Sequence, residues 1–515
     1  MQSGTLAGNF RGTKAFRHLS VYLDKAVQSY KAMSATTFND PTTVALPPER
    51  IHRLVGYGMR SAADGYLFRP TSVDNIRQIL DLARETGRKI VLRGAGRSYG
   101  DANVGSECII VDISRMNRIL SWDPKTGLID CESGVTIEGL WRTTLEDGFW
   151  PPVVSGTMYP TLGGALGMNI HGKNSFKVGT LGDQVVELDV LFPNGEFHTL
   201  TPKDDLFYQV ISSAGLLGII TRARLKMKRV HSGDVKVLAV SCDNWDDQFA
   251  FFDKFEHDSD YMVSWIDCFG KGAHNGRGQI HVAWYQNESF ELPPSLKPES
   301  QDLPDTILGL VPKSVVWRFL KVLNNRPGMR FVNWAKHHAS LLLGNGKTIE
   351  QSLVGFSFLL DYVPNWRNAY LPGGFIQYQS FIPRDKAKEV FSKQIQMQQD
   401  AKLEAFLGVF KLHKPDKFLF SHAVDGYSMA LDFKVTRRNW KRLEKLCHQM
   451  NEVVLEAGGR FYFAKDSTLR ASDVKSYLGE STLKTFQTLK SKYDPDGLLT
   501  SNLASRLDLN GSRVQ

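Results

Sequence analysis

The chain has 515 residues, of which 42% are hydrophobic and 23% are charged, and its formal net charge is +9. This length exceeds one ordinary core, so two or more domains are expected, and the composition excludes a disordered or fibrous protein. No run of about 18 apolar residues predicts a membrane-spanning helix, and Met1–Tyr30 lacks the apolar segment of a secretory signal. The positive charge favours anionic partners, such as a phosphorylated cofactor or substrate, nucleic acid or an acidic membrane surface.

Five cysteines are scattered along the chain without a C-x-x-C pair: Cys108, Cys131, Cys242, Cys268 and Cys447. An odd and dispersed set predicts neither a disulfide framework nor a zinc site, and it suits a reducing compartment. We therefore expect a cytoplasmic protein without a metal site.

Hydrophobic periodicity and turn residues predict the elements of a first, α+β domain. A first helix begins at a capping box formed by Thr71 and Asp74 and ends at Gly87. The elements that follow are strands over 89–93 and 109–113, two strands around Asn194-Gly195, a short helix from Asp204 and a strand from Ile219.

Strand-like segments at 375–382 and 428–433 indicate a second, mostly antiparallel domain. Four parts are predicted along the chain. They are an irregular N-terminal extension at 1–48, the first domain at 49–230, a substrate domain at 231–458 and a C-terminal segment at 459–515 that returns to the first domain.

A glycine-rich loop follows the strand at 89–93, with the order Arg93-Gly94-Ala95-Gly96-Arg97-Ser98-Tyr99-Gly100-Asp101. A polar turn and a strand come next, whereas the Rossmann fingerprint needs a helix after its glycines, so an NAD site is disfavoured. Such a loop can bind phosphate through convergent backbone N–H groups, or it can be a tight turn whose glycines satisfy positive φ.

A second glycine-rich stretch lies about 60 residues later, from Ser155 to Gly167, and continues into Met168-Asn169-Ile170-His171-Gly172-Lys173-Asn174. The pair Gly163-Gly164 permits close backbone approach, and the hydroxyls of Thr157 and Thr161 can donate to a phosphate. Two such loops without Rossmann context indicate one extended diphosphate ligand, held from two sides.

Several polar residues each allow two interpretations. Lys465, in Phe-Ala-Lys-Asp-Ser, reads as part of an apolar strand and is either a surface lysine paired with Asp466 or a cation directed at a ligand. His171 is either a core histidine or a ligand neighbour. Gln377 and Gln379 share one face of a strand, which is either solvent-facing or the lining of a pocket.

The two loops, in this order, resemble the FAD-binding fold of the vanillyl-alcohol oxidase and p-cresol methylhydroxylase (PCMH) superfamily. Within it they resemble the decaprenylphosphoryl-β-D-ribose 2′-oxidase family, the flavin subunits of an epimerase. The resemblance covers roughly residues 50 to 507. Its matching stretches are Arg93–Asp101, Gly163–Ala165, Ile170–Asn174, Gly218–Ile220, Gly374–Gln379, Val409–Lys411, Gly426–Phe433 and Tyr462–Ser467. It implies an α+β, two-domain PCMH-type FAD-binding fold whose substrate domain is built on an antiparallel sheet.

The resemblance also implies which residues hold the flavin. They are Arg93, Gly94, Ala95, Gly96, Arg97, Ser98, Tyr99, Gly100, Gly156, Thr161, Gly163, Gly164, Asn169, His171, Ile220 and Tyr462. Many members of the superfamily tether the flavin through a histidine in the first loop. Arg97 occupies that place here, so we predict that FAD is bound noncovalently.

Catalytic and substrate positions are implied in the same way. Lys465 matches a lysine beside the flavin, where a cation stabilises the anionic reduced form. His171 and Tyr99 match flavin neighbours and complete the catalytic set, although Tyr99 can equally serve plain packing. The substrate positions are Lys173, Gln377, Gln379, Lys411, Ser428 and Ala430. The best-known members carry asparagine and cysteine at the last two positions, so the pocket of this chain differs in size and polarity and lacks the thiol that covalent inhibitors of the family need.

The implied reaction is FAD-dependent oxidation of a secondary hydroxyl to a ketone on a polyprenylphosphoryl pentose or a related anionic sugar. It combines hydride transfer to the flavin with proton loss to a base, for which Tyr99 and Lys465 are the candidates. It is the first half of an epimerisation and calls for an NAD(P)-dependent reductase as partner. The alternatives are an alditol or aldonolactone oxidase of the same fold and, from another class, a flavin-free lipid- or anion-binding protein.

Basic and apolar residues are interleaved from about 313 to 347, and the basic ones are Lys313, Arg318, Lys321, Arg326, Arg330 and Lys336. The pattern favours either a peripheral membrane segment, useful for a substrate with a polyprenyl tail, or an amphipathic helix that covers the second domain. No RNA or DNA module accompanies it, so no nucleic-acid partner is expected.

Overall fold

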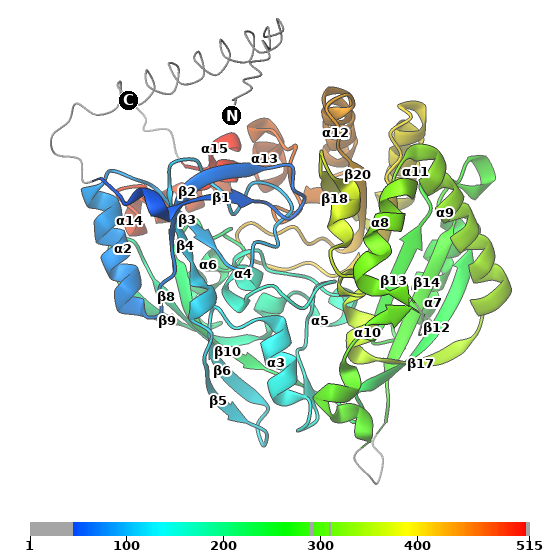
Figure 1. The fold of residues 1–515 in the computed structure, drawn as a ribbon, viewed down its shortest axis with the longest axis horizontal. Coiled ribbons are helices and arrows are strands. Elements are labelled where there is room, and N and C mark those ends of the chain that lie inside the picture. Colours follow the sequence, from blue (N-terminus) through cyan, green and yellow to red (C-terminus); the bar gives the residue numbers. More distant parts are fainter. Residues whose placement is uncertain (1–44, 288–292, 308–310, 511–515) are drawn as a thin grey trace, which may run out of the picture. The chain divides into compact units, whose positions relative to one another are not determined.

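The computed structural model describes residues 45–287, 293–307 and 311–510 (Figure 1). Contacts group Pro47–Arg84 and Arg88–Gln515 into one compact unit. The extension predicted at 1–48 falls almost wholly outside the described residues, and the boundaries at 230 and 458 stay a prediction. Among the described residues, no helix combines the length and the apolar character needed to cross a bilayer.

A four-stranded mixed sheet carries the first glycine loop. Its order is β1-β2-β4-β3, with β1 at Ile51–Val55, β2 at Ala62–Phe68, β4 at Ile109–Asp112 and β3 at Ile90–Arg93. Strands β3 and β4 run parallel, so the loop that leaves β3 emerges at the carboxyl end of both strands. The predicted strands at 89–93 and 109–113 are thereby confirmed.

Helix α2, Val73–Glu85, confirms the predicted helix and buries Ile76, Ile79, Leu80 and Ala83. The hydroxyl of Ser72 accepts a hydrogen bond from the backbone N–H of Asn75 at 3.2 Å. Ser72 therefore caps the helix, in place of the predicted box at Thr71 and Asp74.

The second sheet is five-stranded and antiparallel, in the order β5-β6-β10-β8-β9. Its strands are β5 Ile119–Asp123, β6 Leu128–Glu132, β10 Ile219–Lys226, β8 Val185–Leu191 and β9 Phe197–Leu200. With helix α6 at Asp205–Val210, this block has the succession of strand, turn, strand, helix and strand that the sequence predicts between 187 and 224.

The third sheet has eight antiparallel strands in the order β17-β12-β14-β13-β19-β20-β18-β21. They are β17 Thr348–Ser352, β12 Asp234–Cys242, β14 Gly278–Tyr285, β13 Tyr261–Ile266, β19 Leu407–His413, β20 Gly426–Lys434, β18 Phe375–Pro383 and β21 Arg460–Phe461. The predicted strands at 375–382 and 428–433 are β18 and β20. Lys465, in contrast, lies in a turn after β21, so the strand expected there is wrong.

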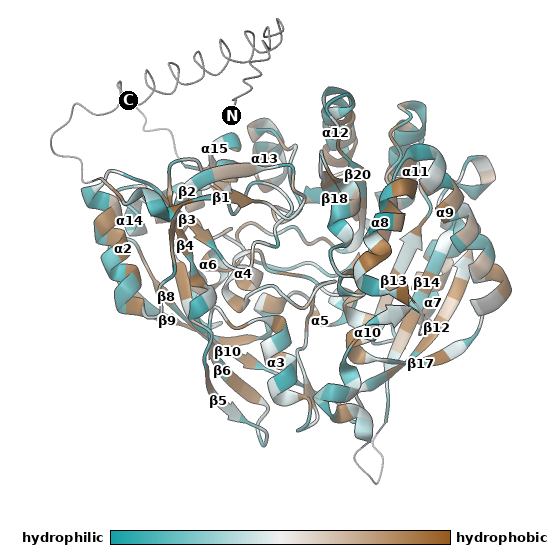
Figure 2. Ribbon diagram, viewed as in Figure 1, coloured by the Kyte–Doolittle hydropathy of each residue, from teal (hydrophilic) through white to brown (hydrophobic). Residues whose placement is uncertain are grey.

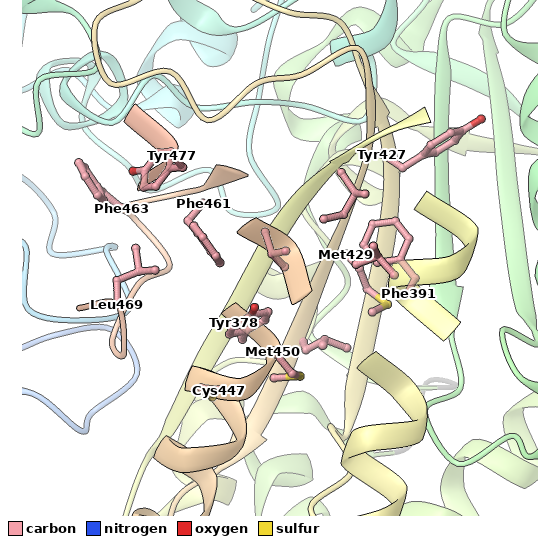
Figure 3. Packing of buried hydrophobic residues seen from close by; sticks show 14 of the residues in the cluster. Tyr378, Phe391, Tyr427, Met429, Cys447, Met450, Phe461, Phe463, Leu469 and Tyr477 are labelled. Carbon is pink, nitrogen blue, oxygen red and sulfur yellow. The ribbon is translucent and has the colours of Figure 1, made fainter. Parts of the chain in front are cut away.

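Alternation along β18 and β20 divides the sheet into two different faces. Tyr378 and Met429 point into a core that helices α11, Arg384–Asp400, and α12, Trp440–Glu456, cover (Figure 3). In that core Phe391 of α11 and Met450 of α12 are fully buried. Residues at the intervening positions lie on the opposite face, which forms part of a cavity.

Further helices and two strand pairs connect the sheets, besides several short 3-10 helices. The helices are α3 Ile137–Thr144, α4 Leu162–Gly167, α5 Ser175–Val178, α7 Trp245–Phe255, α8 Lys313–Leu323, α9 Arg326–Ala339, the π-helix η7 Ser340–Gly344, α10 Leu353–Ser357, α13 Ala471–Leu478, α14 Glu480–Tyr493 and α15 Asn502–Arg506. The strand pairs are β7 Phe149–Trp150 with β11 Lys228–Arg229, and β15 Thr306–Ile307 with β16 Val311–Pro312.

The segment after β21 lies against the four-stranded sheet. The N–H of Ile90 donates to the carbonyl of Leu498 at 2.7 Å. Arg506 of α15 forms ion pairs with Asp101 in the first glycine loop and with Asp466 beside Lys465, at 2.8 Å each. These contacts join the two segments that carry Lys465 and the glycine loop.

Candidate active site

A cavity of about 540 Å³ lies between the two glycine-rich segments and the strands β13, β18, β19 and β20. This volume is typical of a site for a cofactor or a drug-sized ligand. Its lining contains four lysines and two arginines and no carboxylate: Lys173, Lys336, Lys411, Lys465, Arg93 and Arg97. Such a lining attracts an anionic ligand.

The first glycine loop forms one wall through its backbone. A Cβ atom on Gly94 would lie 2.0 Å from the hydroxyl oxygen of Thr161, so only glycine lets the two loops meet there. A Cβ atom on Gly100 would lie 1.8 Å from the carbonyl oxygen of Asp466. These close approaches explain why the two glycine-rich segments and the Lys465 turn form one wall.

Arginines flank this wall in two different ways. The guanidinium of Arg93 donates to the carbonyl and the side-chain oxygen of Asn103, at 3.1 and 2.8 Å, and so holds the loop closed. Arg97 lies between the rings of Tyr57 and Tyr159, and its buried Nε has no hydrogen-bond partner in the part of the chain that the structure describes. Arg97 is thus a cation in the lining whose Nε–H can donate a hydrogen bond to a ligand.

The second segment is partly helical where the sequence suggests a loop. Residues Leu162–Gly167 form α4, and the hydroxyl of Thr161 caps it by accepting from the N–H of Gly164 at 3.4 Å. The hydroxyl of Thr157 donates to Asp361 at 2.8 Å. Of the two hydroxyls expected to donate to a phosphate, the proton of Thr157 is therefore already engaged.

Most of the predicted site residues line this one cavity, and only Gly100 and Asn169 do not. Gly100 packs against the Lys465 turn. The side-chain oxygen of Asn169 accepts from the N–H of Gly182 at 2.9 Å, so Asn169 holds the backbone in place. Their roles and those of the lining residues stay a prediction.

Lys465 and Tyr99 lie together in the cavity wall. The Nζ of Lys465 is 3.8 Å from the centre of the Tyr99 ring, a cation–π contact. Burial lowers the pKa of Lys465 well below its ordinary value, and the carboxylate of Asp432 partly opposes this shift. Burial raises the pKa of Tyr99 well above 10, so between the two predicted bases Lys465 is the one that loses its proton near neutral pH.

Asp432 does not line the cavity, but its charge acts on Lys465, and the sequence did not reveal it. It lies on the cavity face of β20, and its Oδ1 accepts from the side-chain amide of Gln377 at 2.5 Å. Burial raises its pKa, and the hydrogen bond from Gln377 and the charge of Lys465 partly oppose this shift. Nothing in the local sequence distinguishes Asp432 from a surface residue, because its surroundings come from distant strands.

The remaining lysines are also shifted toward neutrality. Burial, and then the charge of Lys411, lowers the pKa of Lys173 to about 7, and burial lowers that of Lys411 to about 8. Each lysine binds an anion only while it is protonated, so their shifted pKa values tie anion binding to pH.

Lys336 also lines the cavity, whereas the sequence predicted it only as part of the basic stretch from 313 to 347. It is an exposed residue of α9 in the basic stretch, and its Nζ lies 4.2 Å from the ring centre of Trp265. Desolvation lowers its pKa to about 8. Trp265 and His281, which line the cavity near it, were also missed.

Comparison with known proteins identifies the family of the chain. Residues 65–201 match the family described as FAD binding domain. The decaprenylphosphoryl-beta-D-ribose oxidase of Mycolicibacterium smegmatis is 30% identical over 487 residues, which are 93% of this chain and 100% of that protein. The L-gulonolactone oxidase of Bos taurus is 22% identical over 444 residues, which are 84% of this chain and 92% of that protein. The D-arabinono-1,4-lactone oxidase of Yarrowia lipolytica is 27% identical over 165 residues, which are 31% of each chain.

The matched range contains both glycine-rich segments, and the longest match extends across all three sheets. The chain therefore belongs to the PCMH-type family of FAD-binding oxidoreductases, together with decaprenylphosphoryl-β-D-ribose oxidase, and it is a flavoenzyme.

Proposed function

We propose that this flavoenzyme oxidises a secondary hydroxyl to a ketone on a polyprenylphosphoryl pentose or a related anionic sugar, as the first half of an epimerisation. The observation that carries the proposal is the cationic lining of the cavity, which holds four lysines and no carboxylate. The name of the Mycolicibacterium relative points to the same substrate class. Family membership sets aside the flavin-free binding protein.

The lining residues fit FAD. The backbone of Gly94–Ser98 can approach a diphosphate closely, and the buried Nε of Arg97, hydroxyl of Tyr99 and Nδ1 of His171 have no partner within the described protein. In this proposal these residues hold the cofactor, with Ile220 and Tyr462 completing the pocket. When bound, FAD accepts the hydride from the carbinol carbon.

The chain's own residues then handle charge and orientation. Protonated Lys465 stabilises the negative charge that the reduced cofactor carries, and neutral Lys465 can take the hydroxyl proton. Lys173 and Lys411 bind the phosphate of the substrate, and Gln377 and Gln379 orient the sugar.

Anaerobic bleaching of the flavin tests the substrate. The purified holoenzyme is mixed with phosphorylated pentoses, including a short-chain prenylphosphoryl ribose, and with free alditols and aldonolactones. We expect the prenylphosphoryl ribose to bleach the flavin fastest. The lactone oxidases among the relatives support the second candidate, an alditol or aldonolactone oxidase, and faster bleaching by these compounds would decide for it.

The cofactor is proposed to be noncovalent, because arginine stands at position 97, where a tethering histidine is found in many members of the superfamily. Precipitation of the yellow protein with acid tests this point. We expect the colour in the supernatant, whereas colour in the pellet would show a covalent link. The epimerisation also calls for an NAD(P)-dependent reductase, which a coupled assay for the reduced product would reveal.

Helices α8 and α9 are proposed to touch a membrane surface, in keeping with a lipid-linked substrate. They are amphipathic (Figure 2), and Phe319, Val322, Phe331 and Trp334 are 64%, 74%, 60% and 49% exposed. The exposed basic residues Arg318, Lys321 and Arg330 suit anionic lipid.

Sedimentation with vesicles tests the membrane contact. We expect binding to vesicles of phosphatidylglycerol and little binding to phosphatidylcholine. Changing Phe331→Ser and Trp334→Ser together should reduce binding about tenfold or more, since each large side chain contributes about 1.5–3 kcal/mol when buried. Leu120→Ser, at an equally exposed position on β5, is the matched control. Equal binding of all three proteins would show that these helices only cover the second domain.

A further inference from the structure

Three buried histidines lie together at the edge of the cavity, and one of them, His171, lines it. The ring centre of His171 is 4.9 Å from that of His413 and 5.4 Å from that of His422. Burial lowers the pKa of His171 and His413 well below 6.5 and that of His422 to about 3. All three rings are therefore neutral near pH 7, and each has one nitrogen that accepts a hydrogen bond.

Hydrogen bonds link two of these rings to Ser428. The side-chain amide nitrogen of Gln379 lies 3.2 Å from the Nε2 of His171 and 3.2 Å from the hydroxyl of Ser428. The hydroxyl of Ser428 lies 2.7 Å from the Nε2 of His413. All four side chains are buried, so water does not compete for these bonds.

The direction of the bond between Ser428 and His413 depends on which nitrogen of the neutral His413 ring carries the proton. The proposed arrangement is the tautomer with this proton on Nδ1, in which Ser428 donates to the Nε2 of His413 at 2.7 Å. The amide of Gln379 donates to Ser428. A hydroxyl has one proton and two lone pairs, so Ser428 retains a single lone pair for any other partner.

Ser428 lines the cavity, and its neighbour across the strand pair is Lys411, which also lines it. A protonated lysine can only donate. Ser428 differs, because its proton is engaged by His413 and it offers the ligand only an acceptor. A ligand group that reaches Ser428 must itself donate, as a hydroxyl does and as a carbonyl or a carboxylate does not.

We propose that His413 is a positioning residue that makes Ser428 an acceptor, and that this pair selects and orients a hydroxyl of the bound sugar. The proposal rests on the proposed function for the identity of the ligand as a sugar. The lysines then bind the anionic part of the ligand, and the pair of His413 and Ser428 recognises a hydroxyl.

The pair of His413 and Ser428 is tested by combining a change in the protein with the removal of one hydroxyl from the ligand. Binding is measured from the change in the flavin absorption of the holoenzyme, with short-chain prenylphosphoryl ribose and its 2-deoxy and 3-deoxy forms as probes. In His413→Phe we expect the parent sugar to bind about five- to tenfold more weakly, the range of one neutral hydrogen bond. One of the deoxy forms should bind His413→Phe and the wild type equally, because it lacks the hydroxyl concerned.

Further variants separate positioning from packing. Ser428→Ala should show the same pattern and covers the case in which His413→Phe does not fold. His413→Gln restores an acceptor and should bind the parent sugar within about twofold of the wild type. His422→Phe is the matched control, because neither ring nitrogen of His422 has a hydrogen-bond partner among the described residues, Ser428 included. Any effect of His422→Phe should be the same for all three sugars.

The outcomes distinguish this inference from the proposed function. If His413→Phe weakens every deoxy form as much as the parent sugar, His413 only packs and the inference fails. If only an alditol or aldonolactone reduces the flavin of the wild type, the proposed substrate is wrong. The pair of His413 and Ser428 is then tested with that compound and its deoxy form in the same way. If no hydroxyl compound of the panel changes the flavin spectrum, the selection of a hydroxyl is refuted.

Discussion

The two walls of the cavity are built on opposite principles. On the side of the glycine loops, residues without a side chain let neighbouring backbone segments approach one another closely, as at Gly94 and Gly100. On the side of β18, β19 and β20, side chains project from a rigid sheet at two-residue intervals, as Gln377 and Gln379 do. The first wall is therefore intolerant of added atoms, whereas the second can exchange side chains and with them the substrate.

The largest effect is expected at Lys465, where the two walls meet. Lys465→Ala should slow reduction of the flavin by substrate about 10²–10³-fold, since preorganised charge stabilisation has this magnitude. Stopped-flow absorbance under anaerobic conditions measures this rate. The protein should still be isolated with FAD. Lys475→Ala, which removes an exposed lysine paired with Glu480, is the control. A rate within about threefold of the wild type would remove Lys465 from the chemistry.

A smaller effect is expected from one methyl group in the backbone wall. Gly94→Ala places its Cβ 2.0 Å from the hydroxyl oxygen of Thr161, so the loops must separate. Overpacking of this kind costs about 1–3 kcal/mol, and we expect FAD to bind about tenfold more weakly or worse. Titration of the apoprotein with FAD, followed by flavin fluorescence, measures this affinity.

Gly139→Ala is the matched control for that experiment. Gly139 lies in helix α3, where the nearest atom to an added Cβ is 3.3 Å away, and alanine favours a helix. Its FAD affinity should equal that of the wild type. If Gly94→Ala also bound FAD normally, the wall of glycine loops would accept an added methyl group, which contradicts the contrast drawn between the two walls.

An effect of about tenfold is expected from pH. The lowered pKa values of Lys173, about 7, and Lys411, about 8, mean that these two lining residues are cationic below these values and lose their charge above them. The KM for a phosphorylated substrate should therefore rise about tenfold between about pH 6.5 and pH 9, while the affinity for FAD changes less. Bound phosphate itself raises these pKa values and shifts the rise to higher pH. A neutral polyol gives the control curve, and equal pH dependence for both compounds would exclude lysine–phosphate contacts.

The smallest effect is expected at Ala430, on the side-chain wall. Ala430→Cys adds a single sulfur atom to the cavity lining. We expect unchanged FAD content, thermal stability within about 1 kcal/mol and a KM within about threefold of the wild type. The new thiol should also become available to thiol-reactive inhibitors that leave the wild type unaffected, which mass spectrometry of the intact protein detects. Loss of FAD from this variant would show that both walls are equally intolerant.

The contrast between the walls also explains what the sequence could predict. Glycines at fixed spacing are a local signal, so both glycine-rich segments and the strands around them were predicted. Alternation in β18 placed Gln377 and Gln379 on one face. Lys336, Asp432 and His413 carry no local signal, because their roles depend on strands and helices far away in the chain.

The expected strand at Lys465 was wrong for a related physical reason. An apolar run is typical of a strand, but Tyr462, Phe463 and Ala464 are buried here in a turn that packs against the glycine loop. Tertiary packing supplies the burial that the sequence pattern attributes to a sheet.

The ion pairs of Arg506 have a consequence for how the enzyme is made. Asp101 and Asp466, which Arg506 joins, are separated by most of the chain, so the two halves of the wall around Gly94, Gly100 and Lys465 are synthesised at very different times. A growing polypeptide can fold its four-stranded sheet early, yet the wall stays open until the stretch around residue 506 has left the ribosome. We therefore expect capture of the cofactor to be a late event of biogenesis.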